Sequence, residues 1–203
     1  MLSYSISMVN NSRELENYST ADLVDELLRR PIINNGFVIP DVYRLIATLK
    51  PINSVDIIPV RDQELQTEIG IILRATGREA GKYGILGGNL DKNESILDAV
   101  GRHLRTDLGI RNFRLVPPQT ESRPFLVQPY YHQPNPTSEH PFDPGKHSIG
   151  LTFLVEIDGQ PQPQEEARDF IWINEVGIPP ATAYNQGFIM KKAFEFLRFT
   201  GKI

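Results

Sequence analysis

The chain has 203 residues, of which 40% are hydrophobic and 23% charged, and its formal net charge is -4 at pH 7. These totals are typical of one large globular domain, or of one domain with an N-terminal extension. The acidic balance argues against nucleic acid as a partner, because that partner requires a basic stripe. The chain has no cysteine, which excludes disulfides, thiolate metal sites and cysteine nucleophiles.

Membrane and export signals are also missing from the sequence. No apolar run approaches the roughly 18 residues that a membrane span requires. The segment from Met1 to Glu14 lacks the basic-then-apolar layout of a signal peptide. We therefore expect a cytoplasmic protein with no membrane partner.

The N-terminal part of the chain predicts two short helices. The first begins near Ser19, whose hydroxyl can cap it, and carries leucines along one edge. The second follows Pro40 and ends at Pro51. We expect an N-terminal helical extension over residues 1–37 and the main domain over residues 38–203. The extra helix could exchange between two copies of the chain, or add contacts to a homodimer interface.

Beyond residue 51 the sequence changes to runs of β-branched residues, with two helical segments among them. The predicted strands are Ser54–Val60, Glu68–Ala75, Phe125–Tyr131, Ser148–Ile157 and Phe170–Ile173, with a polar turn at Arg61–Gln66. The predicted helices are residues 94–108 and Gly187–Phe199. Adjacent strands with few helices indicate an α+β layered fold.

The stretch Pro129–Lys146 holds five of the sixteen prolines. A connection this rich in proline is either functional or a surface loop without chemical importance. Histidine titrates in the range that a general base needs, and the candidates here are His132, His140 and His147. We favour His132, because it follows Tyr130 and Tyr131 at a strand end, where aromatic rings could stack on a base or sugar.

The segment from Gly87 to Ile110 carries the chemistry. Two glycines, Gly87 and Gly88, end a strand and allow a close approach of the backbone to an anion. A helix follows, with Glu94 near its N-terminus and Gly109 as its C-terminal stop. Positions 103, 106 and 107 share one face of that helix, where three carboxylates would make an oxygen cage for Mg²⁺.

This segment resembles the Nudix box, which reads Gly, five residues, Glu, seven residues, then Arg-Glu-hydrophobic-any-Glu-Glu-any-Gly-hydrophobic. The matching residues are Gly88, Glu94, Arg102, Leu104, Gly109 and Ile110. The departures are His103, Thr106 and Asp107, at positions where Nudix hydrolases carry metal-binding glutamates. The resemblance implies a Nudix-type α/β/α sandwich with a mixed β-sheet.

The opening of the box and its acidic-Leu-Gly ending also resemble the GDP-mannose mannosyl hydrolases. That likeness implies a Mg²⁺ or Mn²⁺ ion held by the carbonyl of Gly87 and by Asp107, with a loop histidine as general base. By position, Arg102 corresponds to the arginine of the box. Arg78 lies close in sequence to the position where that group has a phosphate-binding arginine. The downstream half resembles an uncharacterised Nudix-related family in its Arg-His-Leu-x-x-Asp-Leu-Gly, its Phe142-Asp143-Pro144 turn and its Asp169-x-x-Trp172 strand.

Several of these residues have a second interpretation. Asp107 is a metal ligand or a helix-end carboxylate paired with Arg102 or Arg105, and Glu94 is catalytic or orders the loop. Arg102 contacts substrate or pairs with Glu94. We also expect contacts to substrate from four residues, of which the arginines could grip phosphate in a bidentate way: Arg74, Arg78, Asn89 and Tyr130.

Two functions of different classes follow. The first is a divalent-cation-dependent Nudix-like hydrolase of a nucleoside diphosphate linked to another moiety, such as a nucleotide sugar. Its catalytic residues would be His132, Arg102 and Glu94. The second is a Nudix fold that binds a nucleotide or a protein without cleavage, since Arg102, His103 and Arg105 could meet phosphate without metal.

Overall fold

The computed structural model of the chain describes six stretches of sequence: residues 33–34, 37–38, 46–47, 50–63, 66–132 and 140–202. The chain divides into two compact units, residues 1–46 and residues 47–203. In the first unit, strands β1 (Ile33–Asn34) and β2 (Phe37–Val38) pair antiparallel.

The predicted N-terminal helices fall mostly outside the described residues. The helix expected from Ser19 lies wholly outside them. Of the helix expected after Pro40, residues 46 and 47 are described, and both are helical. The boundary that we placed between residues 37 and 38 stays a prediction.

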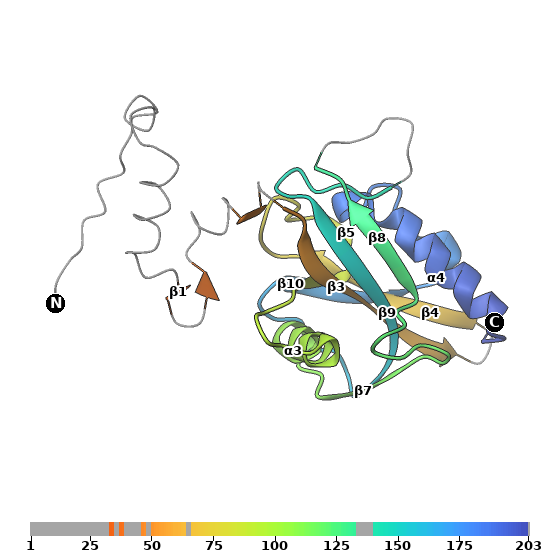
Figure 1. Cartoon of the computed structure of the whole chain (residues 1–203). Helices are drawn as coiled ribbons and strands as arrows, with labels where there is room; N and C mark the ends of the chain where they lie inside the picture. The colour runs from red at the N-terminus through yellow and green to blue at the C-terminus, as the bar shows by residue number, and fades with distance from the viewer. Residues whose placement is uncertain are drawn as a thin grey trace, which may run out of the picture. The chain divides into compact units, whose positions relative to one another are not determined.

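A mixed sheet of eight strands forms the second unit (Figure 1). The strands are β3 (Ile52–Gln63), β4 (Gln66–Arg74), β5 (Tyr83–Gly84), β6 (Leu86–Asn89), β7 (Asn112–Leu115), β8 (Leu126–Tyr130), β9 (Ser148–Asp158) and β10 (Ala167–Ile173). The main path runs β10-β4-β3-β9-β7, while β5 pairs with β4, β6 with β3 and β8 with β9. The central strands β3 and β9 are parallel, and the other pairs are antiparallel.

One helix covers each face of this sheet, which gives three layers. Helix α3 (Ile96–Leu108) packs on one face and α4 (Gly187–Phe199) on the other (Figure 1). Two short 3-10 helices, η2 (Glu175–Gly177) and η3 (Ala183–Asn185), lead into α4. The predicted α/β/α sandwich with a mixed sheet is confirmed.

Alternation along β3 divides the core into two apolar clusters. Val55 and Ile57 point toward α3, where they join Leu104 and Phe153. Ile58 and Val60 belong to the cluster on the α4 face, with residues of α4 such as Phe194. Ser54 and Asp56 therefore lie on the α4 face, which is polar at this end of the strand.

Helix α3 begins and ends at the residues that its sequence indicates. The hydroxyl of Ser95 is the N-cap and accepts a hydrogen bond from the backbone N–H of Asp98 at 3.1 Å. Gly109 ends the helix in the left-handed conformation, with φ 69°, and its N–H is bonded to the carbonyl of Arg105. Glu94 stands one residue before the cap, so it is free to turn back toward the loop.

The structure also corrects some of the predicted elements. The polar turn predicted at Arg61–Gln66 is wrong in extent, because β3 and β4 stay paired up to Gln63 and Gln66. Strand β7 was not expected: its residues alternate between polar and apolar, but the run is only four residues long. The structure agrees to within a few residues with the predicted ranges of both helices and of β3, β4, β8, β9 and β10, whereas β5 was not predicted.

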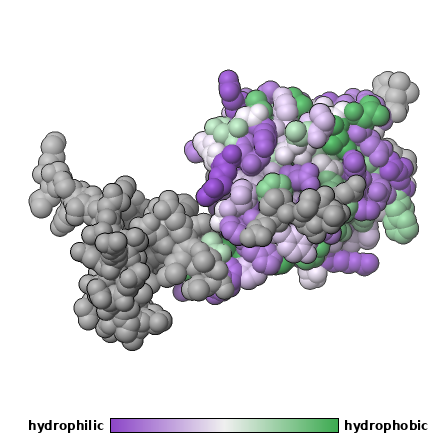
Figure 2. All heavy atoms as spheres, turned by 90° about the horizontal axis from the view of Figure 1, so that it is seen from above, coloured by the Kyte–Doolittle hydropathy of each residue, from purple (hydrophilic) through white to green (hydrophobic). Residues whose placement is uncertain are grey.

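The surface of this unit is mixed in character. In the view of Figure 2, hydrophilic and apolar residues are interspersed over the described part of the chain. The large apolar side chains that are exposed lie apart in the sequence: Val127, Tyr131, Val176 and Phe199. Among the described residues, no helix combines the length and the apolar character that crossing a membrane would require.

Candidate functional site

Two glycines let strand β6 pack tightly against its neighbours. Gly87 has φ 147°, and a Cβ there would stand 2.1 Å from the carbonyl oxygen of Val55 on β3. A Cβ at Gly88 would stand 2.6 Å from Cε1 of His103 on α3. Only glycine therefore allows the imidazole of His103 to lie directly on β6. These contacts explain physically why the box begins with this pair.

An arginine–carboxylate pair fixes the loop between β6 and α3. Arg102 donates to both carboxylate oxygens of Glu94, from Nε at 2.7 Å and from Nη2 at 2.8 Å. Arg102 also donates to the carbonyl of Asn89 at 3.0 Å, and Glu94 accepts from the N–H of Asp91 at 3.0 Å. These bonds hold the pKa of Glu94 below its usual value. The pairing of Arg102 with Glu94, one of two alternatives in the sequence, is the one that the structure shows.

His103 and Asp107 form the next part of the same chain of hydrogen bonds. Nη1 of Arg102 lies 3.3 Å from Nε2 of His103, and Nδ1 of His103 lies 3.3 Å from Oδ2 of Asp107. Because arginine only donates, Nε2 is the acceptor and Nδ1 carries the proton toward Asp107. Both residues are buried on α3. Thr106, the third position of that face, is exposed.

His103 and Asp107 do not by themselves form a site for a divalent cation. Both nitrogens of His103 already have partners, and the carboxylate of Asp107 is bonded to His103 and buried. Among the residues that the structure describes, no group of three or more His, Cys, Asp or Glu side chains is placed to hold a metal ion. Mg²⁺ normally takes one or two carboxylates together with water or ligand phosphates. The protein groups of α3 alone do not make such a site.

A second buried chain of hydrogen bonds lies on the other face of the sheet. The hydroxyl of Tyr130 donates to Oδ2 of Asp56 at 2.7 Å, and Nε2 of Gln186 donates to the hydroxyl oxygen at 2.9 Å. The side-chain oxygen Oε1 of Gln186 in turn accepts a hydrogen bond from the backbone N–H of Ile85 at 2.8 Å. Gly150 makes room for this chain, since a Cβ there would stand 2.7 Å from Oδ2 of Asp56. The sequence did not reveal this network.

Asp56 is the carboxylic acid of this network, and its pKa is raised. Burial raises its pKa from 3.8 to about 6, while the hydrogen bond from Tyr130 and the positive charges of Lys146 and Arg74 act in the opposite direction. In the register of the sheet, Asp56 stands opposite Gly87. The carboxyl group therefore lies beside the glycines of the box, within the field of several cationic side chains.

The turn that follows the proline-rich stretch brings Lys146 to the box. Nζ of Lys146 donates to Oδ1 of Asn89 at 2.5 Å. The turn itself is closed by Asp143, whose carboxylate accepts from the N–H of Gly145 at 2.7 Å. The turn also holds His147, whose ring stacks on Tyr131 with centroids 5.9 Å apart. Lys146 was not among the residues that the sequence pointed to.

The two arginines predicted to contact substrate lie near this turn. Arg74 is buried at the end of β4, donates to Glu166 at 2.9 Å, and lies over the ring of Tyr184 at 5.4 Å. Arg78 is exposed, and its Nε lies 3.1 Å from the position that a Cβ of Gly145 would take. We call four cationic residues the basic rim: Arg74, Arg78, Arg102 and Lys146.

The structure brings most of the predicted site residues together. Asn89 joins Arg102 and Lys146, while Gly87 lies beside Asp56. Tyr130 is buried, with its hydroxyl bonded within the network, so the exposed ring at this strand end is that of Tyr131. His132 is exposed at the residue after Tyr131.

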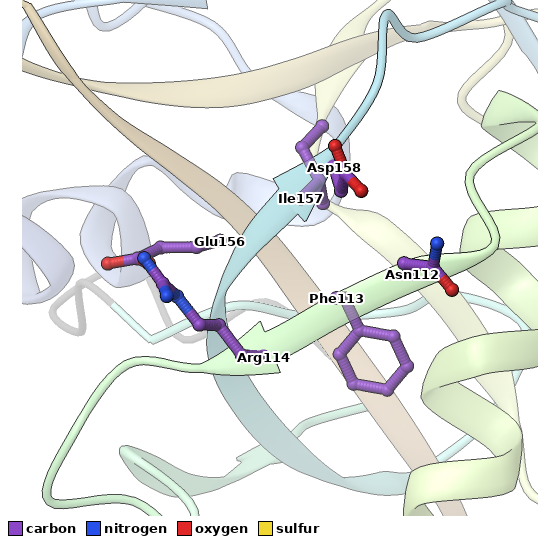
Figure 3. Close-up of a pocket in the computed structure, with 6 residues that line it drawn as sticks. All are labelled: Asn112, Phe113, Arg114, Glu156, Ile157 and Asp158. Atoms are coloured by element: carbon purple, nitrogen blue, oxygen red, sulfur yellow. The ribbon is translucent and has the colours of Figure 1, made fainter.

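A separate hollow lies away from this site. Figure 3 shows the residues of the paired strands β7 and β9 that line it: Asn112, Phe113, Arg114, Glu156, Ile157 and Asp158. Arg114 and Glu156 form an ion pair across it. It contains no residue of the box and no residue of the basic rim.

Comparison with solved structures defines the class of protein. A possible asymmetric diadenosine tetraphosphate hydrolase from Jonesia denitrificans is 26% identical, with a TM-score of 0.62, over 72% of this chain and 94% of that chain. The NUDIX domain of Shewanella oneidensis NrtR, complexed with ADP ribose, is 14% identical with a TM-score of 0.55, over 89% of this chain and 99% of that chain. A C. elegans Ap4A hydrolase is 14% identical with a TM-score of 0.55, over 72% of this chain and 98% of that chain.

The chain therefore has the Nudix fold, as its box indicated. Residues 36–192 match the family described as "Domain of unknown function (DUF4916)", and the chain belongs to that family. No curated protein sequence matches the chain.

Proposed function

We propose that the protein is a Nudix-type hydrolase of a nucleoside diphosphate linked to another moiety, for example a nucleotide sugar. The observation that carries this proposal is the convergence of two cations on Asn89, directly after the glycines of the box. Arg102 bonds the carbonyl of Asn89, and Lys146 bonds its side chain. Phosphate oxygens are well matched by such donors beside a half-buried glycine backbone. The similar structures include a protein complexed with ADP ribose and an Ap4A hydrolase.

Each part of the site has a role in this proposal. The basic rim and Asn89 bind and orient the diphosphate, while the rings near the end of β8 contact the base or sugar. Water adds to the anomeric carbon of the linked sugar as the bond from that carbon to the phosphate oxygen breaks. His132 takes the proton of the water, and the nucleoside diphosphate leaves.

A divalent cation, Mg²⁺ or Mn²⁺, stays part of the proposal. Its protein ligands would be the carbonyl of Gly87 and the carboxylate of Asp107, completed by the phosphates of the ligand. When bound, it would neutralise charge on the diphosphate. Since Asp107 is bonded to His103, no step given above depends on the cation.

A second candidate is a Nudix-fold protein that binds the nucleotide without cleaving it. The continuous chain Glu94–Arg102–His103–Asp107 favours this candidate. It places His103, and an Asp107 that is hydrogen-bonded to it, at positions where the resembled hydrolases carry metal-binding glutamates. Binding would then rest on the basic rim alone.

One experiment tests both candidates. The protein is incubated with ADP-ribose and with GDP-mannose, in Mg²⁺, Mn²⁺ or EDTA, and thermal stability and products are measured. Product formation that EDTA and Asp107→Asn abolish supports the hydrolase with its cation. Product formation that neither change affects supports hydrolysis without the cation. Stabilisation by an intact ligand supports the second candidate, since about 2.7 kcal/mol is expected at a hundred times Kd.

The role of Lys146 has a matched control in the same chain. Lys146→Met should weaken binding about tenfold or more, because it removes a charge that faces the phosphates. Lys192→Met removes an equal charge, one that pairs with Glu195 on α4 and not with Asn89, and should leave binding unchanged. If no ligand stabilises the protein and no ligand is converted to product, the proposed function is wrong.

A further inference from the structure

Helix α4 carries a regular row of four residues on the side that faces away from the core. The members of this row follow one another at intervals of four, so they lie along one side of the helix: Gly187, Lys191, Glu195 and Phe199. The buried residues of α4 lie on its other side, toward the sheet that the helix covers (Figure 1). Gly187 is half-buried and the other three members are exposed. The row is therefore part of the outer surface of the second unit.

The C-terminal end of the row is apolar. Phe199 is 88% exposed, and Val176 of η2 is 92% exposed. The residues next to them in the sequence, Arg198 and Glu175, form an ion pair at 2.6 Å, which ties η2 to this end of α4. Two large apolar side chains thus stand in water at one end of the helix. A partner that covers them would remove that apolar surface from water.

The N-terminal end of the row borders a second hollow, of about 380 Å³. Gly187 and Lys191 both line this hollow. Its apolar lining comes from the segment before α4 and from the first turn of the helix: Ile178, Pro179, Pro180 and Phe188. Because Gly187 has no side chain, the row is lowest where the apolar hollow begins. A large apolar side chain from outside could enter there.

The row is complementary to a reversed copy of itself. When a second α4 crosses the first midway between Lys191 and Glu195 and runs antiparallel to it, Lys191 of each copy stands beside Glu195 of the other. Gly187 and Phe199 both lie six residues from that crossing point, about 9 Å along the helix axis. Each phenyl ring therefore meets the glycine of the other copy and the hollow beside it. Rows of this spacing lie alongside each other when two helices cross at about 50°.

We propose that α4 forms the interface of a homodimer with two-fold symmetry, in which Phe199 of each copy enters the hollow beside Gly187 of the other. A two-fold interface uses the same surface of both copies, so that surface must be complementary to itself, as this row is. Glu195 already pairs with Lys192 of its own helix, through Oε2 at 2.7 Å, and its Oε1 can accept from Lys191 of the second copy. The row contains no residue of the box or of the basic rim, so this inference is independent of the proposed function.

Sedimentation equilibrium of the full-length protein, from about 1 µM to about 1 mM, tests the proposal. An interface made by one helix and one hollow is at the small end of specific interfaces, so the dimer should have a dissociation constant in the micromolar range. The Tm of every variant is measured at the lowest concentration, where the wild type is monomeric. Since the substituted residues are exposed, these Tm values should agree.

Exchanging the two charges of the row separates this interface from others. Lys191→Glu alone, or Glu195→Lys alone, places like charges beside each other at two symmetric contacts, so each should weaken dimerisation about tenfold or more. The double variant Lys191→Glu/Glu195→Lys restores opposite charges at both contacts and has the net charge of the wild type. Its dissociation constant should return to within about threefold of the wild-type value.

The apolar contact has a matched control in the same chain. Phe199→Asp should weaken dimerisation about a hundredfold or more, because it removes both buried rings and puts a charge into each hollow. Val127→Asp makes the same kind of change at another exposed apolar residue, on β8, and should dimerise as the wild type does.

Three results would overturn the proposal. The first is a wild type that stays monomeric over the whole concentration range. The second is a dimer that Phe199→Asp leaves intact, and the third is a double variant that dimerises no better than the single ones. A monomeric wild type that binds vesicles of phosphatidylcholine and phosphatidylserine, with binding lost in Phe199→Asp, would assign this surface to a membrane instead.

Discussion

A buried acid shows how much a single residue determines in this protein. Asp56 lies within β3, where its neighbours on both sides in the sequence, Val55 and Ile57, are fully buried. Its carboxyl group has one hydrogen bond, from Tyr130, and stands in the field of Lys146 and Arg74. Such a group makes the stability of the fold depend on pH, and the direction of the shift in its pKa decides whether stability rises or falls with pH.

We predict that Asp56→Asn stabilises the protein above pH 6. Burial raises the pKa of Asp56 to about 6 in the folded protein, from 3.8 when unfolded. The stability linked to the neutral carboxyl is therefore fully present below pH 3.8 and lost as the pH rises through 6, up to about 3 kcal/mol. Free energies of unfolding in urea between pH 4 and pH 8 test this. Asp158→Asn, an exposed aspartate of β9, controls for the loss of one charge.

The expected result is a difference between variant and wild type that grows with pH. A difference that stays constant from pH 4 to pH 8 would contradict the prediction. A difference that shrinks with pH would mean that Lys146 and Arg74 stabilise the charged carboxylate more than burial destabilises it.

At the scale of elements, the contact between β6 and α3 is the tightest part of the box. His103 lies where the side chain of residue 88 would be, and it bonds Arg102 and Asp107 along the helix. The loop between the two elements is fixed at the same time by Glu94. The strand, the loop and the helix therefore form one rigid unit that presents Asn89.

We predict that Gly88→Ala costs about 1–3 kcal/mol of stability, because its Cβ would stand 2.6 Å from His103. In the His103→Ala background the same substitution should cost at least about 1 kcal/mol less, since the clash is gone. A double-mutant cycle by urea unfolding measures this coupling. Equal costs in both backgrounds would mean that the strain at residue 88 lies in the backbone.

The sequence predicted these elements well where a local rule applied. The spacing of apolar residues and Gly109 located α3, and Gly87 and Gly88 located the end of a strand, whereas the N-cap Ser95 was not named. It missed Lys146 and the hydrogen bond between Asp56 and Tyr130, because both arise where distant segments of the chain come together. It could not show that Arg102, His103 and Asp107 are bonded to one another, since spacing alone leaves their partners open.

At the scale of the whole molecule, the sheet separates two apolar cores. Ile57 belongs to the core under α3, and Ile189 belongs to the core under α4. Both side chains are 0% exposed. No residue belongs to both cores. Small substitutions in the two cores should therefore change the free energy of unfolding independently.

We predict that Ile57→Val and Ile189→Val each cost about 0.5–1.5 kcal/mol, through loss of one buried methylene. The double variant should cost their sum within about 0.5 kcal/mol, as expected for sites without shared partners. Urea unfolding of the four proteins measures this. A departure of more than about 1 kcal/mol would show that the sheet transmits strain between its faces.

The parallel pairing of β3 with β9 has a consequence for the order in which the protein assembles. These strands pair over nine residues although they lie about a hundred residues apart in the chain. Closing so long a loop is slow, so the centre of the sheet can form only after most of the chain has been synthesised. Asp56 and Thr152 face each other across this seam. A chain in which β3 and β9 are paired has therefore already been synthesised at least as far as residue 156, and this pairing would report a late stage of folding.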